Sequence, residues 1–158
     1  MQHALENNRN GLAAGLIGAF LAFFLLIAGL ASAKEPLPFK VIVHSSNAAA
    51  AALTTKELSK IFLKKTTHWK DEKKIEAVDL GADSSIRESF SRYVHGKSVT
   101  AVKAYWQQQI FSGRATPPAE LKDDAAVIAF VKSNEGAIGY VSAGADVGEL
   151  KVLAVWSE

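Results

Sequence analysis

The chain has 158 residues, of which 49% are hydrophobic and 22% are charged, and it contains no cysteine. This composition is that of a globular protein, which excludes a disordered, collagen-like or disulfide-stapled chain. Without cysteine there is no thiolate-ligated zinc site, no iron–sulfur cluster and no thiol nucleophile. The net charge of +2 is too close to neutral to indicate wholesale binding of nucleic acid, which we do not expect as a partner.

The N-terminal 33 residues have the pattern of a targeting segment. Residues 12–30 carry no charge, Arg9 is the only Arg or Lys before them, and Ala31-Ser32-Ala33 follows as an A-x-A cleavage pattern. We therefore predict that residues 1–33 are a signal peptide that is cleaved on export. The uncharged run is also long enough to span a bilayer, so a retained membrane anchor is the alternative. Both interpretations place residues 34–158 outside the cytoplasm, in the periplasm or its extracytoplasmic equivalent.

The next part of the chain predicts a strand, a helix and a second strand. Residues 39–44 (FKVIVH) are rich in β-branched side chains and read as a strand, which Ser45-Ser46-Asn47 interrupts. The alanine run that follows is helical or a loop. Thr54 and Glu57 then form a capping box that opens a helix, and residues 75–80 are the second strand.

The remaining sequence predicts three further helices and two strands. Ser85 and Glu88 suggest a second capping box, and Gly96 stands where the glycine after a helix end is expected. The next helix carries an apolar stripe from Val99 to Ile110, and a fourth is capped by Asp123 or Asp124. Two strands follow, over residues 137–141 and 151–156.

This order of strands and helices predicts an α/β fold with a mixed, mostly parallel sheet flanked by helices. One domain over residues 34–158 is as much as this length supports. Trp69 lies in a polar turn, so we expect it to be open to a partner. The predicted core residues share helical or strand spacing on apolar faces: Ile61, Phe62, Phe90, Trp106, Val127, Phe130 and Ile138.

Four stretches of residues 39–155 resemble the phosphate-binding-protein-like domain (PBP-like domain) of the type 2 periplasmic binding proteins. They are Val41-Ile42-Val43 with Asn47, residues 53–65 with Trp69, residues 104–106 with residues 110–113 and Pro117-Pro118, and residues 136–141. The resemblance implies a substrate-binding protein of a phosphate ABC transporter. Its partners would be a small phosphate-like anion and an ABC permease or another membrane or periplasmic protein.

The sequence also departs from this family. Members with an established phosphate site carry an R-x-D-G-S-G-T turn before a helix. Here Leu80 stands in place of the arginine and Ala82 in place of the acid, and Ser84 alone keeps its identity. The full family fold has two lobes that close on a ligand, whereas residues 34–158 resemble a short, single-lobe form. Half of the ligand cage is therefore missing or comes from another chain, as in a homodimer.

Two polar turns are the candidate ligand-binding sites. Helix starts offer free N–H groups and a positive dipole end to an anion, and loops after strands host ligands in open α/β sheets. The plain alternative is ordinary capping and turn chemistry. The candidate residues are Ser45, Ser46 and Asn47 in the first turn, and Asp83, Ser84, Ser85 and Arg87 in the second.

Other groups of residues give weaker indications of function. Residues 56–74 contain seven lysines, which suit anionic lipid or an acidic partner but are equally typical of a solvated surface. The four histidines show no metal-binding spacing, and no phosphate loop or nucleophile motif is present, so we expect no metal, no cofactor and no enzymatic activity. Two functions remain open: an exported solute-binding-like protein for phosphate or another oxyanion, and an interaction or accessory domain that has lost the ligand site.

Overall fold

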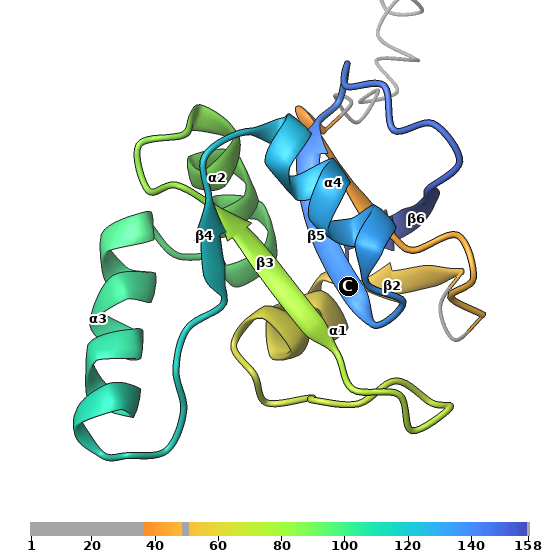
Figure 1. The fold of residues 1–158 in the computed structure, drawn as a ribbon. Helices are drawn as coiled ribbons and strands as arrows, with labels where there is room; N and C mark the ends of the chain where they lie inside the picture. Colours follow the sequence, from red (N-terminus) through yellow and green to blue (C-terminus); the bar gives the residue numbers. More distant parts are fainter. Residues whose placement is uncertain (1–36, 49–50, 158) are drawn as a thin grey trace, which may run out of the picture. The chain divides into compact units, whose positions relative to one another are not determined.

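The computed structural model describes residues 37–48 and 51–157, so the predicted signal peptide lies outside the described residues. The described strands form one six-stranded sheet in the order β2-β6-β1-β5-β3-β4 (Figure 1). Their bounds are β1 Phe39–Val43, β2 Ala52–Thr54, β3 Glu76–Leu80, β4 Ala119–Leu121, β5 Ala137–Ser142 and β6 Lys151–Trp156.

One strand of the sheet runs against all the others. β1 pairs antiparallel with β5 and with β6, while β2–β6, β3–β5 and β3–β4 are parallel pairs. This confirms the predicted mixed, mostly parallel sheet. Because β1 is antiparallel to β3, the residues that follow β1 lie at the opposite end of the sheet from the residues that follow β3.

The helices cover both faces of the sheet. Adjacent residues of a strand point to opposite faces. In β5, Gly139 faces α4 (Asp124–Ser133), where a Cβ would lie 2.6 Å from Val127, and Tyr140 contacts Phe62 and Phe90 from the other side. These two aromatic residues belong to α1 (Thr55–Phe62) and α2 (Ser85–Phe90). α3 (Val99–Phe111) lies beyond the β4 edge (Figure 1).

Two of the predicted helix starts are confirmed. The Thr54 hydroxyl accepts a hydrogen bond from the Glu57 amide (3.2 Å), and the Glu57 carboxylate accepts one from the Thr54 amide (2.9 Å). This reciprocal pair is the capping box of α1. Asp123 caps α4 by accepting a hydrogen bond from the Ala126 amide (2.8 Å).

The second predicted capping box was wrong. Ser84, one residue earlier than predicted, caps α2, because its extended backbone lets its hydroxyl accept from the Arg87 amide (3.3 Å). Glu88 instead forms an ion pair with Arg92, one helical turn later (2.7 Å). α2 continues into a π-helical turn, η1 (Ser91–His95), which ends at Gly96 with φ 62°, as predicted for this glycine.

The core forms around stacked aromatic rings. Phe90 stacks on Tyr140 with ring centres 3.8 Å apart, and both rings contact Phe62 and Phe39. The remaining predicted core positions Ile61, Val127 and Ile138 are also buried in this cluster.

Three large side chains, Trp106, Phe130 and Trp69, lie outside the centre of this aromatic cluster. Trp106 is buried as expected but lies outside the main cluster, and Phe130 is only partly buried. The expectation that Trp69 is open to a partner was wrong. Its side chain is buried, and its indole Nε1 donates a hydrogen bond to the Gly136 carbonyl (3.0 Å), which fixes the turn after α1 against the start of β5.

Candidate functional site

The turn between β3 and α2, residues 81–84, lies where three parallel strands end. β3, β4 and β5 share one direction, so their carboxyl ends meet at one edge of the sheet, where ligands bind in open α/β folds. Two backbone hydrogen bonds shape the turn: Gly81 N–H donates to the Leu121 carbonyl and Ser84 N–H to the Gly81 carbonyl, each at 3.0 Å. We call this segment the β3–α2 turn.

The polar side chains of this turn differ in what they offer a ligand. Ser85 and Asp83 are exposed, and Ser84 is partly exposed while its hydroxyl caps α2. The Asp83 carboxylate folds back over Gly81, where a Cβ would lie 3.0 Å from Oδ1. The N–H groups of the first turn of a helix have no intrahelical acceptor, so Ser85 and Ile86 present donors at this edge.

Arg87 has a different position from the one that the sequence suggested. Its side chain is 3% exposed and extends beneath the turn, where Nη1 pairs with Asp79 Oδ1 (2.5 Å) and donates to the Leu80 carbonyl (2.8 Å). Tyr140 also donates its hydroxyl to Asp79. Glu120 is the next carboxylate, 3.9 Å from Nη1. The guanidinium therefore holds the end of β3 against α2 from inside the protein.

The charges of Asp79 and Arg87 largely neutralise each other. Burial raises the pKa of Asp79 to about 6, against the opposing attraction of Arg87 and the hydrogen bond from Tyr140. At neutral pH the Asp79 carboxylate is therefore ionised and neutralises most of the Arg87 charge. Burial, reinforced by the Asp79 charge, also raises the pKa of Tyr140, so its hydroxyl stays protonated and remains a donor.

The first predicted turn lies elsewhere. Ser45, Ser46 and Asn47 follow β1 and so lie at the opposite end of the sheet from the β3–α2 turn. Ser46 hydrogen-bonds to His44 Nδ1 (2.7 Å). Asn47 is buried, and its carbonyl accepts a hydrogen bond from Lys151 Nζ (2.7 Å). The structure thus separates the two predicted turns, and one ligand cannot contact both within a single chain.

Sequence reasoning missed Asp79 and Tyr140. The signal was present, because Asp79 is an acid among the buried residues 77–80 of β3, and a charged side chain in a buried strand needs a partner. The partner, Arg87, is eight residues away across a turn, and only the folded chain brings the two together.

A family model described as a PBP superfamily domain matches residues 38–155, most of the chain. The chain belongs to the PBP superfamily. A search of curated proteins gave no significant match.

Solved structures of the superfamily share this fold. They include a putative phosphate ABC transporter substrate-binding protein from Clostridium perfringens, solved with bound phosphate (22% identity, TM-score 0.57, 75% of this chain and 44% of that one). An ABC-type phosphate transport receptor from Vibrio cholerae matches at 21% identity and TM-score 0.59, over 75% of this chain and 48% of that one. A possible phosphate binding protein from Planctomyces limnophilus matches at 18% identity and TM-score 0.58, over 76% and 42%.

This PBP superfamily chain spans less than half the length of each of these proteins. At such identities the likeness establishes the fold, and the described residues form one lobe of the PBP type. In the described part of the chain no helix is both long and apolar enough to cross a membrane.

Proposed function

We propose that this chain is an extracytoplasmic, non-enzymatic solute-binding lobe that binds a small oxyanion of the phosphate class at the β3–α2 turn. The observation that carries the proposal is the position of Ser84. It caps α2 at the carboxyl ends of three parallel strands, in a fold whose solved relatives are described as phosphate-binding. It is also the residue that keeps its identity in the family's phosphate-binding turn.

The groups that would hold the anion are backbone and hydroxyl donors. The N–H groups of Ser85 and Ile86, the two serine hydroxyls and the positive end of the helix dipole all favour a negative charge there. Arg87 contributes little direct attraction, because Asp79 neutralises it beneath the turn. Asp83 opposes an anion by its own charge. Binding by one lobe should therefore be weak.

The transport role follows from the same proposal. An exported lobe that binds an anion weakly would close on it with a second lobe or a second copy, and would deliver it to an ABC permease or another membrane or periplasmic protein. Exclusion of water by the second lobe would strengthen every charged hydrogen bond to the anion.

The second candidate function is an interaction domain that has lost its ligand. Two observations favour it. Leu80 offers no guanidinium where the family uses one, and the guanidinium of Arg87 is already paired with Asp79. In addition, Ile110 and Phe111 at the end of α3 are 52% and 90% exposed, an apolar surface that a partner protein would cover.

An NMR titration separates the two candidates. Protein purified after expression of the full-length chain would be titrated with inorganic phosphate while backbone amide shifts are followed. We expect the largest shifts at residues 84–86, and their loss in Ser84→Ala. The matched control is Ser112→Ala, which removes another serine hydroxyl next to a helix end, one that donates to the Gln109 carbonyl. Absence of any shift at residues 81–87 would reject the anion site and favour the interaction domain.

A further inference from the structure

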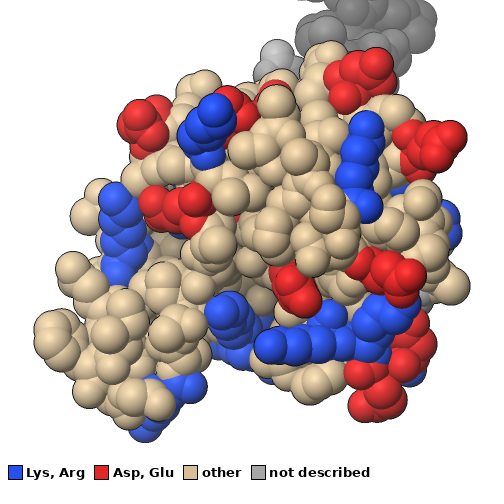
Figure 2. Space-filling model, in the orientation of Figure 1, with Lys and Arg blue, Asp and Glu red and all other residues tan. Residues whose placement is uncertain are grey.

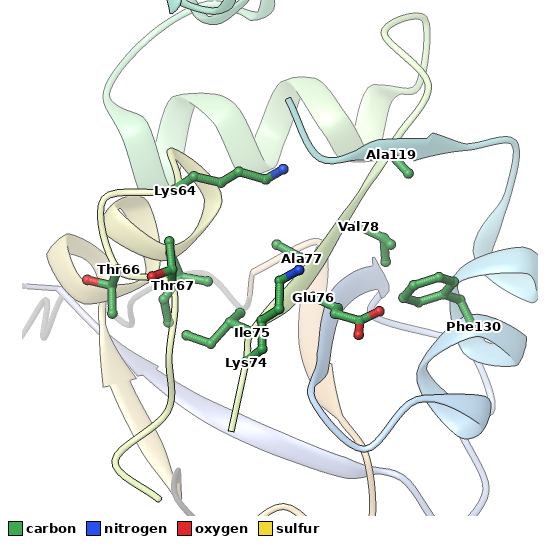
Figure 3. Close-up of a pocket in the computed structure, with 11 residues that line it drawn as sticks. Lys64, Thr66, Thr67, Lys74, Ile75, Glu76, Ala77, Val78, Ala119 and Phe130 are labelled. Atoms are coloured by element: carbon green, nitrogen blue, oxygen red, sulfur yellow. The ribbon is translucent and has the colours of Figure 1, made fainter. Parts of the chain in front are cut away.

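A cavity of about 370 Å³ lies at the other end of β3 from the β3–α2 turn, and the oxyanion function proposed above does not use it. It is bounded by the turn after α1, the first half of β3, the start of β4 and α4 (Figure 3). Its volume falls in the range of small-molecule sites. Ile75, Val78 and Phe130 give it apolar walls, and Thr66 and Thr67 add hydroxyl groups.

Two lysines bring positive charge to this cavity. Figure 3 shows the side chains of Lys64 and Lys74 extending into the same space, with Phe130 across from them. Among the described residues, no carboxylate forms an ion pair with either ammonium group. Glu76 also lines the cavity, but it pairs with neither lysine. Figure 2 shows basic and acidic side chains next to one another along the lower edge of this face.

Lys64 is held in an unfavourable backbone conformation. Its φ is 52°, in the left-handed region, which costs a residue with a side chain about 1 kcal/mol relative to glycine. Its ammonium group donates to the Pro117 carbonyl at 3.3 Å, which fixes the side chain across the mouth of the cavity. Partial burial and the nearby charge of Lys74 lower the pKa of Lys64. Lys64 directly follows the C-cap Leu63 of α1, where a left-handed residue is a common way for a helix to end.

We propose that this cavity binds a small, soluble organic phosphate monoester. Its phosphate group would lie between the ammonium groups of Lys64 and Lys74. Its organic group would cover the apolar wall at Val78 and Phe130. A phosphate monoester carries close to two negative charges at neutral pH, which matches the two lysines that no described carboxylate pairs with.

The test uses phenyl phosphate and the protein purified after expression of the full-length chain. Calorimetry and amide shifts should show binding at Thr67 and Ala77, about tenfold tighter than binding of inorganic phosphate to the same cavity, because only the ester covers the apolar wall. Lys64→Gly and Lys74→Gln should each weaken binding of phenyl phosphate about tenfold, and the exposed α3 lysine variant Lys103→Gln should leave it unchanged. Glu76→Gln should strengthen binding, because it removes the carboxylate that repels the ligand.

Lys64→Gly also controls for misfolding. Because glycine adopts the left-handed region without cost, this variant should melt at the same temperature as the natural protein or higher, yet bind less phenyl phosphate.

Two results would overturn the inference. One is phenyl phosphate binding that is unchanged in both lysine variants. The other is a protein that binds vesicles containing phosphatidic acid but does not bind phenyl phosphate. Binding lost in Ser84→Ala but kept in both lysine variants would move phenyl phosphate to the β3–α2 turn, which rejects this inference and leaves the proposed function standing. The reverse pattern, with phenyl phosphate in the cavity and no phosphate at the turn, rejects the proposed function instead.

Discussion

Asp79 and Arg87 hold two elements together by charges that lie almost entirely out of water. Nη1 of Arg87 lies 2.5 Å from Asp79 Oδ1, and their side chains are 3% and 6% exposed. Removal of one partner from such a buried pair leaves the other charge without compensation and costs about 3–5 kcal/mol. The pair therefore matters more for the stability of the β3–α2 turn than an exposed ion pair such as Glu88–Arg92.

Arg87→Met is the variant that tests this role. We expect the free energy of unfolding to fall by about 3–5 kcal/mol, because Asp79 would stay buried without a cation. Arg92→Met, which breaks the exposed pair with Glu88, should cost less than about 1 kcal/mol. Urea unfolding of both variants measures the difference. Equal and small losses would mean that the Asp79–Arg87 pair does not support the turn.

His95 makes the stability of the fold depend on pH. Its Nδ1 hydrogen-bonds to the Ser59 hydroxyl at 2.9 Å, and its ring contacts Phe90 edge-on. Burial, with the charges of Arg87 and Lys97, lowers the pKa of His95 from 6.5 to about 4. The unfolded chain therefore takes up a proton below pH 6.5 that the folded chain binds only near pH 4.

The expected result is a difference between the natural protein and His95→Gln in how stability changes with pH. At His95 the unfolded state binds more protons, so this residue should lower the free energy of unfolding by roughly 2 kcal/mol between about pH 6.5 and about pH 4.5. Asp79, with a pKa raised to about 6, acts in the opposite direction by a similar amount, but equally in both proteins. Urea unfolding at both pH values should thus show that acidification is less favourable to the natural protein than to His95→Gln by roughly 2 kcal/mol. The same change with pH in both proteins would contradict this account.

Among single residues, helix caps were easier to predict from the sequence than the contacts between buried polar side chains. Thr54, Asp123 and Gly96 act through neighbours within four residues, so local patterns were enough. Ser84 was missed by one residue because two serines stand together, and the sequence does not show which one has the extended backbone. The Asp79–Arg87–Tyr140 contacts join three separate elements, which no local pattern describes.

At the scale of elements, α2 is fixed to the sheet through aromatic packing. Phe90 is fully buried and contacts the rings of Tyr140, Phe62 and Phe39. Phe111, at the end of α3, is 90% exposed and makes a matched comparison. The same residue type is thus in the centre of the core in one helix and in solvent in another.

We predict that Phe90→Ala lowers the free energy of unfolding by about 3–5 kcal/mol, since it removes a buried ring and leaves a cavity. Phe111→Ala should change it by less than about 0.5 kcal/mol, as for other exposed positions. Chemical unfolding of the two variants gives both values. A cost below about 1 kcal/mol for Phe90→Ala would show that α2 does not pack on β5 as described.

The long elements were predictable and the short edge strands were not. α1, α3, α4 and the four longer strands were all expected near their observed bounds, because each has an apolar period or a β-branched run. β2 (Ala52–Thr54) and β4 (Ala119–Leu121) have three residues each and lie at the two edges of the sheet. Their pairing with β6 and β3 depends on distant segments, so the alanine run before α1 was predicted only as helix or loop.

At the scale of the whole molecule, the direction of β1 decides what one chain can bind. The sequence predicted two polar turns as ligand sites, and the antiparallel β1 places them at opposite ends of the sheet. In the function proposed above, a second lobe or chain would supply the facing half of a ligand cage. The chain spans less than half the length of its solved relatives.

We infer that one lobe binds an oxyanion weakly at the β3–α2 turn. The most direct measurement is a phosphate titration of the natural protein and Ser84→Ala, at two protein concentrations about tenfold apart. We predict a dissociation constant of roughly 1 mM for the monomer, or about −4 kcal/mol, with weaker binding in Ser84→Ala. Affinity that rises with protein concentration would indicate that a second copy closes the site, as the account allows. Submicromolar binding by a proven monomer, or binding that Ser84→Ala leaves unchanged, would contradict the claim.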